Sequence, residues 1–151
     1  DCFRFLYQNK TISIRNPNAV RPWQFVLEPI FGMVSLSSHL QKNTRQFSES
    51  WNFGPSSSKK ITVEEIVKKI IQQWGKGKFK KNPSKKDKEY HEATTLRINS
   101  KKAKKLLNWN SVYTNNESLF ETIEWYKQYY GKNDMKEFSI KQIQKYVNKM
   151  E

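Results

Sequence analysis

The sequence predicts an α+β fold, mostly helical with a few short strands, in a single domain. The clearest observation is the segment 63–74, where apolar side chains recur every three or four residues and so share one helix face. Thr62 and Glu65 have the spacing of a capping box, and Gly75 suits a left-handed helix end. The short apolar run at 10–14 is instead typical of a strand. A chain of 151 residues is long enough for one sizeable core.

The first part of the chain is predicted to hold two helices and a hairpin. Residues 2–9 have the pattern of a helix end, and a strand at 10–14 follows them. A second strand at 20–25 is expected to pair with the first across a turn. Apolar residues then keep helical spacing over 26–42, with Pro29 in the first turn, where its missing N–H costs little.

Loops and short strands are predicted around the helix at 63–74. Residues 42–50 are expected to form a polar loop, and 51–53 a short strand that ends at a Gly-Pro pair. Residues 76–88 hold seven lysines, which favours a mobile loop over a nucleic-acid surface. A further strand is expected at 94–98.

Three helices are predicted in the last third of the chain. Ser100 is expected to cap a short helix that ends before Trp109, and a second helix is expected to end at Gly131. A last helix is expected after Ser139, with Gln142 in the capping-box position. Its expected apolar stripe consists of Ile140, Ile143, Val147 and Met150. The tryptophans expected to anchor the core are Trp23, Trp51, Trp109 and Trp125.

Composition narrows the classes of function. The net charge of +14 brings nucleic acid into question, but only five of the 28 basic residues are arginine, the side chain that reads bases best. The aromatic residues fall mostly at positions expected in the core, which argues against a nucleic-acid partner. No apolar run approaches the roughly 20 residues needed to span a membrane.

Cysteine and histidine are too scarce for a disulfide or a metal centre. Cys2 is the single cysteine, which excludes an internal disulfide and suits a reducing, cytoplasmic location. His39 and His91 lie far apart in the sequence, so no metal cluster is expected.

Two arginines six residues apart, Arg15 and Arg21, flank a turn-forming Asn-Pro-Asn sequence at 16–18. A guanidinium presents a fork of donors that matches the oxygens of a phosphate. The pair is therefore a candidate site for a phosphate-bearing ligand. On composition alone, two surface charges beside a hairpin remain the simpler alternative.

These arginines lie in a segment that resembles CDP-glucose 4,6-dehydratases, which are sugar-nucleotide enzymes of the extended short-chain dehydrogenase/reductase family. The resemblance rests first on Ile-Arg-Asn-Pro-Asn-Ala-Val-Arg-Pro-Trp-Gln at 14–24 and Val-Leu-Glu-Pro at 26–29. Three later segments agree in order and spacing: Trp-Asn-Phe-Gly-Pro at 51–55, His-Glu-Ala at 91–93 and Ser-Lys-Lys-Ala-Lys-Lys-Leu-Leu-Asn-Trp at 100–109.

The resemblance implies a sugar-nucleotide-binding C-terminal region at 1–131, followed by a C-terminal helix of unassigned role at 132–151. Intact enzymes of this family have an N-terminal dinucleotide-binding sheet, which holds NAD and carries a Tyr-x-x-x-Lys pair. This sequence contains neither that pair nor a Gly-x-x-Gly-x-x-Gly motif. We therefore expect a fragment without the cofactor-binding Rossmann sheet, without catalytic residues of its own and inactive alone.

The intact enzyme, a lyase, converts CDP-glucose to CDP-4-keto-6-deoxyglucose for polysaccharide biosynthesis. The partners implied for this chain are a CDP-sugar nucleotide and either a second copy or the missing N-terminal Rossmann part. Two other classes stay open on the residues: a basic module that binds polyanions or RNA, and a non-catalytic interaction module.

The resemblance also assigns roles to individual residues. Arg21 falls where relatives hold the diphosphate, and Arg15 where thymidine-nucleotide relatives place an aromatic side chain over the base. Asn52 falls close to the ligand, with bracing of the backbone as the alternative role. His91 is expected to contact the nucleotide, with a His–Glu pair that braces the loop as the alternative.

Two carboxylates near the expected site are assigned structural roles. Glu28 is expected to form a hydrogen bond to a neighbouring loop, and Glu92 to accompany His91.

Overall fold

The computed structural model describes residues 1–56, 59–82 and 93–150. It confirms an α+β fold that is mostly helical, with a small parallel sheet of two strands. The elements are α1 (Cys2–Tyr7), β1 (Ile12–Ile14), α2 (Leu27–Lys42), α3 (Thr44–Phe47), α4 (Val63–Trp74), β2 (Phe79–Lys81), α5 (Lys101–Leu107), α6 (Asn115–Tyr130) and α7 (Met135–Asn148).

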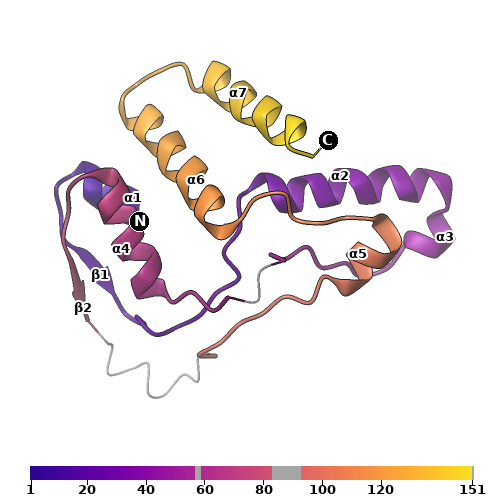
Figure 1. Cartoon of the computed structure of the whole chain (residues 1–151), viewed down its shortest axis with the longest axis horizontal. Helices are drawn as coiled ribbons and strands as arrows, with labels where there is room; N and C mark the ends of the chain where they lie inside the picture. The colour runs from indigo at the N-terminus through magenta and orange to yellow at the C-terminus, as the bar shows by residue number, and fades with distance from the viewer. Residues whose placement is uncertain (57–58, 83–92, 151) are drawn as a thin grey trace.

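The elements gather in two groups that α6 and α7 join (Figure 1). On the left of the view, α1 and α4 lie beside the two strands, and on the right α2 packs with α3 and α5. The helices α6 and α7 pack against each other, and α6 also contacts α4. Loops at 15–26 and 93–100 run between the two groups, so residues far apart in sequence meet there.

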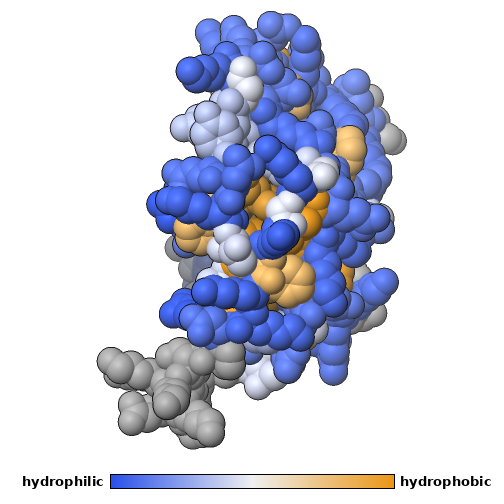
Figure 2. All heavy atoms as spheres, turned by 90° about the vertical axis from the view of Figure 1, so that its left-hand side faces the viewer, coloured by the Kyte–Doolittle hydropathy of each residue, from blue (hydrophilic) through white to orange (hydrophobic). Residues whose placement is uncertain are grey.

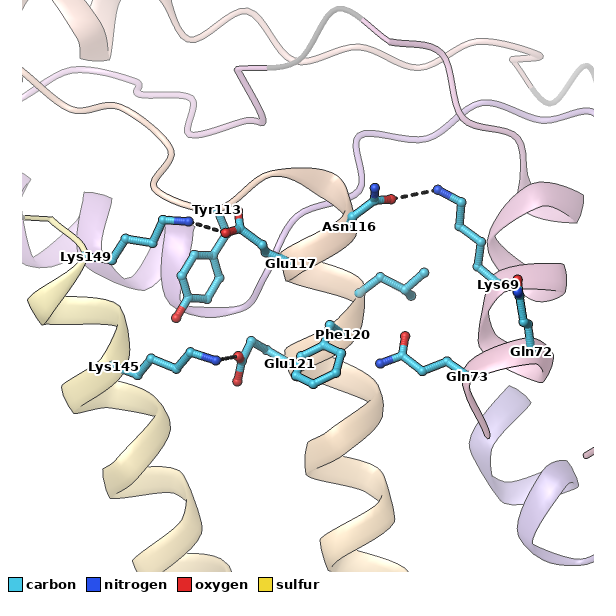
Figure 3. Close-up of a pocket in the computed structure, with 11 residues that line it drawn as sticks. Lys69, Gln72, Gln73, Tyr113, Asn116, Glu117, Phe120, Glu121, Lys145 and Lys149 are labelled. Atoms are coloured by element: carbon cyan, nitrogen blue, oxygen red, sulfur yellow. Dashed lines mark hydrogen bonds and ion pairs between the residues drawn. The ribbon is translucent and has the colours of Figure 1, made fainter. Parts of the chain in front are cut away.

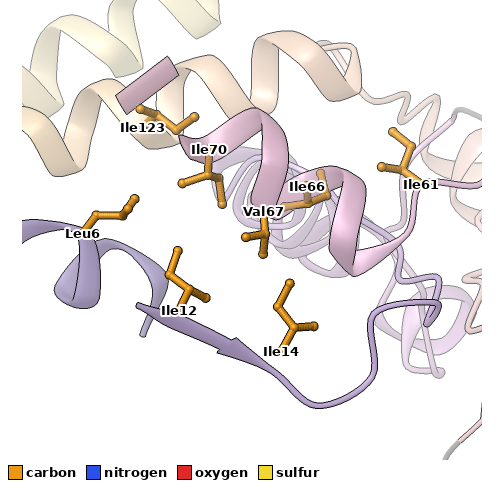
Figure 4. Packing of buried hydrophobic residues seen from close by; sticks show 8 residues of the cluster. All are labelled: Leu6, Ile12, Ile14, Ile61, Ile66, Val67, Ile70 and Ile123. Atoms are coloured by element: carbon orange, nitrogen blue, oxygen red, sulfur yellow. The ribbon is translucent and has the colours of Figure 1, made fainter. Parts of the chain in front are cut away.

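The larger hydrophobic core lies between α4 and β1 (Figure 4). Alternate residues of β1 point inward, so Ile12 and Ile14 are buried while Ser13 is exposed. They meet the apolar stripe of α4 and side chains from α1 and α6. Burying one such aliphatic side chain contributes about 1.5–3 kcal/mol. The buried members of this core are Leu6, Ile12, Ile14, Ile61, Ile66, Val67, Ile70 and Ile123.

Helix α4 agrees with its prediction at both ends. The Thr62 hydroxyl accepts a hydrogen bond from the Glu65 backbone N–H at 3.2 Å, and the Glu65 carboxylate accepts one from the Thr62 N–H at 2.7 Å. Together they form the predicted capping box. Gly75 follows with φ of 94°, a left-handed conformation that glycine adopts without strain.

The predicted hairpin is wrong. β1 pairs in parallel with β2, with Ile12 opposite Phe79, and not with 20–25. A parallel pair needs a long crossover connection, and α4 lies in that connection. Residues 20–25 lack a strand ladder because Pro22 has no N–H to donate. The strand β2 also falls inside the predicted loop at 76–88, most of whose remaining residues belong to 83–92, outside the described residues.

Three other short segments differ from their predictions. The predicted polar loop at 42–50 contains α3, which begins because the Asn43 side chain accepts a hydrogen bond from the Gln46 N–H at 3.2 Å. No strand forms at 51–53, where the Gln24 side chain donates to the Phe53 carbonyl at 3.0 Å. The predicted strand at 94–98 is reduced to one isolated bridge.

The last two helices follow their predictions in part. α6 ends at Tyr130, directly before Gly131, as predicted. α7 begins one turn earlier than predicted, because Asp134 caps it by accepting from the Lys136 N–H at 2.9 Å and the Glu137 N–H at 3.0 Å. Gln142 is therefore not a capping residue and is buried instead.

Several residues predicted in the core are less buried than expected. The stripe of α7 is largely exposed, with Ile140, Ile143 and Val147 each above 40% accessible. Trp109 is fully buried, whereas the other tryptophans expected as anchors are only half-buried: Trp23, Trp51 and Trp125.

The face that carries α1, β1 and β2 has mainly hydrophilic side chains around a central apolar area (Figure 2). None of the described helices is long and apolar enough to cross a membrane.

Candidate functional site

Three segments converge at Val20. Its backbone N–H donates to the Thr94 carbonyl at 2.8 Å, and its carbonyl accepts from the Leu96 N–H at 3.1 Å. On the other side Val20 forms an isolated antiparallel bridge with Thr62, the residue that caps α4. This arrangement fixes the position of the next residue, Arg21, between the loops at 59–62 and 93–98.

Arg21 is held by backbone carbonyls. Its Nη1 donates to the Val20 carbonyl at 2.9 Å and to the Ala93 carbonyl at 3.1 Å, and the residue is half-buried. It lines a pocket of about 180 Å³, which we call the Arg21 pocket. The remaining lining residues are Val20, Pro22, Trp23, Pro55, Ser56, Lys59, Lys60, Leu96, Arg97, Ile98 and Asn115.

The Arg21 pocket is strongly cationic. Besides Arg21, its wall carries Lys59, Lys60 and Arg97, and the described lining residues include no Asp or Glu. Like charges around a concave surface raise the local positive potential and attract anions. The chemistry that this lining favours is the binding of a phosphate or another compact anion.

Buried hydrogen bonds hold the segment next to Pro55, a residue of the pocket lining. The Ser100 hydroxyl accepts from the Gly54 N–H at 2.8 Å and donates to the Gly54 carbonyl at 3.1 Å. A Cβ at position 54 would meet the Cβ of Ile98 at 2.5 Å, so only glycine fits there. Ser100 thus ties 53–55 to the start of α5 and does not cap the helix with its side chain, contrary to the sequence prediction. Trp23, which also lines the pocket, donates from its indole to the Ile61 carbonyl at 3.0 Å.

The structure brings only part of the predicted site together. Among the predicted residues that it describes, Arg21 lines the pocket, whereas Arg15 and Asn52 are exposed and lie outside its lining. His91 and Glu92 fall outside the described residues.

Three cations of the Arg21 pocket were not predicted from the sequence. Arg97 lies in a predicted strand, Lys59 and Lys60 lie between the segment 51–55 and the helix cap at Thr62, and none of the three belongs to a segment that carries the resemblance. The sequence feature that could have pointed to these cations is their proximity to the segments 51–55 and 91–93, which carry the resemblance.

Glu28 is fully buried at the centre of a polar cluster between α2, α7 and the loop before α6. Its carboxylate accepts hydrogen bonds from the Tyr113 N–H at 2.8 Å, from the Val112 N–H at 3.0 and 3.1 Å, and from the Tyr146 hydroxyl at 2.8 Å. Its backbone carbonyl accepts from the Trp109 indole at 3.2 Å. We call this set the Glu28 cluster.

The two tyrosines beside Glu28 stay protonated over a wide pH range. Burial raises the pKa of Tyr146, and the hydrogen bond to the Glu28 carboxylate raises it further. Burial and the charges of Glu121, Glu117 and Glu28 raise the pKa of Tyr113 to about 12.

The described residues do not fit a dinucleotide or a metal. Neither β1 nor β2 leads through a glycine-rich turn into a helix, which is how a dinucleotide pyrophosphate is normally bound. Within the described ranges no three His, Cys, Asp or Glu side chains gather where they could hold a metal ion.

Comparison with known proteins finds a curated protein of similar sequence. No protein-family model matches the chain. A CDP-glucose 4,6-dehydratase from Salmonella typhimurium is 34% identical over 153 aligned positions, which take in 98% of this chain but only 41% of that protein. Because 98% of the chain is matched, the similarity extends past Gly131 into α7, further than the sequence segments indicated. The resemblance is thereby confirmed, and along almost its whole length the chain is similar to the C-terminal portion of a CDP-glucose 4,6-dehydratase.

Proposed function

We propose that the chain is the nucleotide-sugar-binding portion of a CDP-glucose 4,6-dehydratase-like protein of the extended short-chain dehydrogenase/reductase family. The Arg21 pocket would bind the diphosphate of the CDP-sugar. The observation that carries this proposal is the gathering of four cations around one small pocket without a described acidic side chain in its lining. The similarity to the Salmonella enzyme supports it independently.

In this proposal Arg21 has one role in ligand binding and the other three cations have another. Arg21 is oriented by the Val20 and Ala93 carbonyls, so its guanidinium is held in the pocket wall, where it would meet a phosphate. Lys59, Lys60 and Arg97 would neutralise the second phosphate and draw the ligand in.

The Arg21 pocket of about 180 Å³ is too small for a whole nucleotide sugar, since ligand pockets typically hold about 300–1,000 Å³. The cytidine and the hexose therefore extend beyond it. In this proposal Arg15, which is exposed, stacks on the base, and Asn52 and His91 are the further residues that contact the ligand.

Conversion of CDP-glucose to CDP-4-keto-6-deoxyglucose would require parts outside this chain. NAD and the Tyr-x-x-x-Lys pair would be supplied by an N-terminal Rossmann part or by a partner that carries one. We accordingly propose that the chain is inactive alone and works in the cytoplasm, in keeping with its single cysteine.

Thermal unfolding with CDP-glucose, CDP, CMP, UDP and dTDP tests the proposal. Binding to the folded state alone stabilises by about 2.7 kcal/mol at a ligand concentration 100 times Kd. We expect the cytidine diphosphates to raise Tm more than CMP, UDP or dTDP. Absence of any shift at millimolar CDP-glucose would refute the proposal.

A variant pair locates the site. Arg21→Met removes a charge-assisted hydrogen bond worth roughly 1.5–3 kcal/mol, so we expect a 10- to 100-fold weaker Kd for CDP-glucose. Arg45→Met, on an exposed residue of α3, is the matched control and should leave Kd unchanged.

The net charge of +14 keeps a second function in competition, a basic module that binds polyanions or RNA. It predicts tight RNA binding that falls steeply with salt and does not depend on the base. Tight RNA binding together with no response to cytidine nucleotides would favour this function. Stable association with another protein, without either ligand response, would favour an interaction module.

A further inference from the structure

A second pocket adjoins the Arg21 pocket at the start of α6, and we call it the Ser111 pocket. Its volume is about 410 Å³, within the range of pockets that hold small ligands. A ligand can extend from one pocket into the other because their linings share four residues: Pro55, Ser56, Lys59 and Asn115. The remaining lining residues of the Ser111 pocket are Ile61, Lys69, Ser111, Val112, Tyr113, Thr114 and Asn116.

Two polar side chains at the start of α6 already have partners within the chain. The Thr114 hydroxyl donates to the Glu117 carboxylate at 2.8 Å, as part of the capping box of α6. Lys69 reaches across from α4 and donates to the Asn116 Oδ1 at 2.8 Å (Figure 3). Thr114 and Asn116 are therefore partly committed to holding α6 in place.

Asn115 and Ser111 keep the capacity to bind a ligand. Asn115 is half-buried at the first position of α6, and its side chain forms no hydrogen bond with the other described residues. The Ser111 hydroxyl accepts from the Ser56 N–H at 3.0 Å, which leaves its own hydrogen to be donated. An amide offers donors and an acceptor together. This mixture suits neighbouring hydroxyls of a ligand, because each hydroxyl both donates and accepts.

The Ser111 pocket is less cationic than the Arg21 pocket. Its described lining has two cations, Lys59 and Lys69, where the Arg21 pocket has four. Hydrogen bonds from the N-cap residue of α4 lower the pKa of Glu65, and the charges of Lys59 and Lys69 lower it further. The Glu65 carboxylate is thus close enough to offset part of their charge. An uncharged group fits this pocket better than a second anion does.

The rest of the Ser111 pocket wall is partly apolar, through Pro55, Ile61 and Val112. Small-ligand pockets typically combine apolar surface with a few polar groups that fix the orientation of the ligand. A sugar ring matches this combination, because its faces carry C–H groups and its edge carries hydroxyls.

We propose that the Ser111 pocket binds a sugar ring whose neighbouring hydroxyls form hydrogen bonds with the Asn115 amide and the Ser111 hydroxyl. The diphosphate attached to this sugar lies in the Arg21 pocket, so the inference rests on the function proposed above. Lys59, which lines both pockets, contacts the phosphate next to the sugar. The ring is the hexose or the ribose of the CDP-sugar, because both are joined to the diphosphate.

Titration calorimetry of Asn115→Ala with CDP-glucose and with inorganic pyrophosphate tests the proposal. Pyrophosphate carries the diphosphate without a sugar and so reports on the Arg21 pocket alone. We expect CDP-glucose to bind about fivefold more weakly than to wild type, the effect of one lost hydrogen bond between uncharged groups. The Kd of pyrophosphate should stay unchanged. Ser111→Ala should give the same pattern.

Asn110→Ala is the matched control. Asn110 is exposed in the loop before α6 and lies outside both linings, so neither Kd should change. CDP distinguishes the two sugars. If the hexose occupies the Ser111 pocket, Asn115→Ala leaves the Kd of CDP unchanged. If the ribose occupies it, CDP is weakened as much as CDP-glucose. Both results support a sugar in this pocket.

Two results would overturn the proposal and leave the proposed function standing. One is an unchanged Kd of CDP-glucose in Asn115→Ala while wild type binds this ligand. The other is equal weakening of CDP-glucose and pyrophosphate, which would assign Asn115 to the diphosphate. Failure of wild type to bind CDP-glucose would instead overturn both the sugar site and the function proposed for the Arg21 pocket.

Discussion

Glu28 and Arg21 lie seven positions apart in one segment of sequence, yet their surroundings are opposite. Glu28 is fully buried, and its carboxylate is bonded to the chain through two backbone N–H groups and a tyrosine hydroxyl. Arg21 is half-buried, and the described lining of its pocket adds three more cations and no acid.

In our proposal the contrast separates a charge that stabilises the fold from a charge that binds a ligand. The donors around Glu28 join α2, α7 and the loop before α6, so the internal hydrogen bonds compensate the charge. Four cations line the pocket of Arg21, and the positive potential that they produce attracts anions. Substitutions in the two regions should therefore affect different measurements.

The largest effect is expected from Glu28→Gln. The change keeps the size of the side chain but removes the charge and replaces one acceptor oxygen with a donor, leaving a buried donor facing donors. We expect a loss of about 3 kcal/mol in the free energy of unfolding. Urea unfolding measures it, and Glu49→Gln, on an exposed acid that pairs with Lys102, is the control with less than about 0.5 kcal/mol. An equally small effect at Glu28 would contradict the structural role of the cluster.

Features that depend on contacts between residues close in sequence could be predicted, whereas features that depend on distant contacts could not. Helix α4 was predictable because its stripe, its cap and Gly75 all lie within 14 consecutive residues. The partner of β1 was not, because Phe79 lies beyond α4 and only the packing of the helix decides the pairing. Arg21 was identified by its motif, whereas Arg97 enters the pocket only through the bridge at Val20, which no local pattern encodes.

The same limit applies to α7. Its apolar stripe was predictable from spacing, but its exposure was not, because spacing does not tell whether another element covers a face. The contact of Tyr146 with Glu28 spans 118 positions and was equally invisible in the sequence.

The next effect in size compares two buried tyrosines. Tyr146→Phe removes a hydroxyl that donates to the Glu28 carboxylate at 2.8 Å, and we expect it to lower the free energy of unfolding by about 1.5–2 kcal/mol. Tyr113→Phe removes an unpaired hydroxyl and should change it by less than about 0.5 kcal/mol or raise it. Urea unfolding of both variants gives the comparison. Equal losses would show that the hydrogen bond from Tyr146 to Glu28 adds no stability beyond that of a buried, unpaired hydroxyl.

Arg97→Gln tests the proposed ligand-binding role of the cations in the Arg21 pocket. Arg97 is exposed at the rim of the Arg21 pocket, so loss of its charge should weaken CDP-glucose binding about fivefold, or about 1 kcal/mol, without a measurable change in unfolding. Titration calorimetry at 50 and 200 mM salt provides the measurement, and the difference between wild type and variant should shrink at the higher salt. A loss of stability without a loss of affinity would place Arg97 with the structural charges.

The smallest expected effect is the pH-dependent contribution of Glu117 to the free energy of unfolding. Glu117 is 42% exposed and belongs to the capping box of α6, and Lys149 contacts its carboxylate. The hydrogen bond from Lys149, followed by those from the Thr114 N–H and hydroxyl, lowers the pKa of Glu117 from 4.5 to about 2. A lowered pKa in the folded state means that the carboxylate stabilises the fold above pH 4.5 and that this contribution disappears as the pH falls through 2. Because solvent screens a side chain this exposed, the contribution should be about 1 kcal/mol or less.

Glu117→Gln retains the capping geometry but not the charge, so its difference from wild type in urea unfolding should be largest at pH 7 and vanish near pH 2. A difference that stays constant over this range would assign the effect to capping geometry and not to the charge on Glu117.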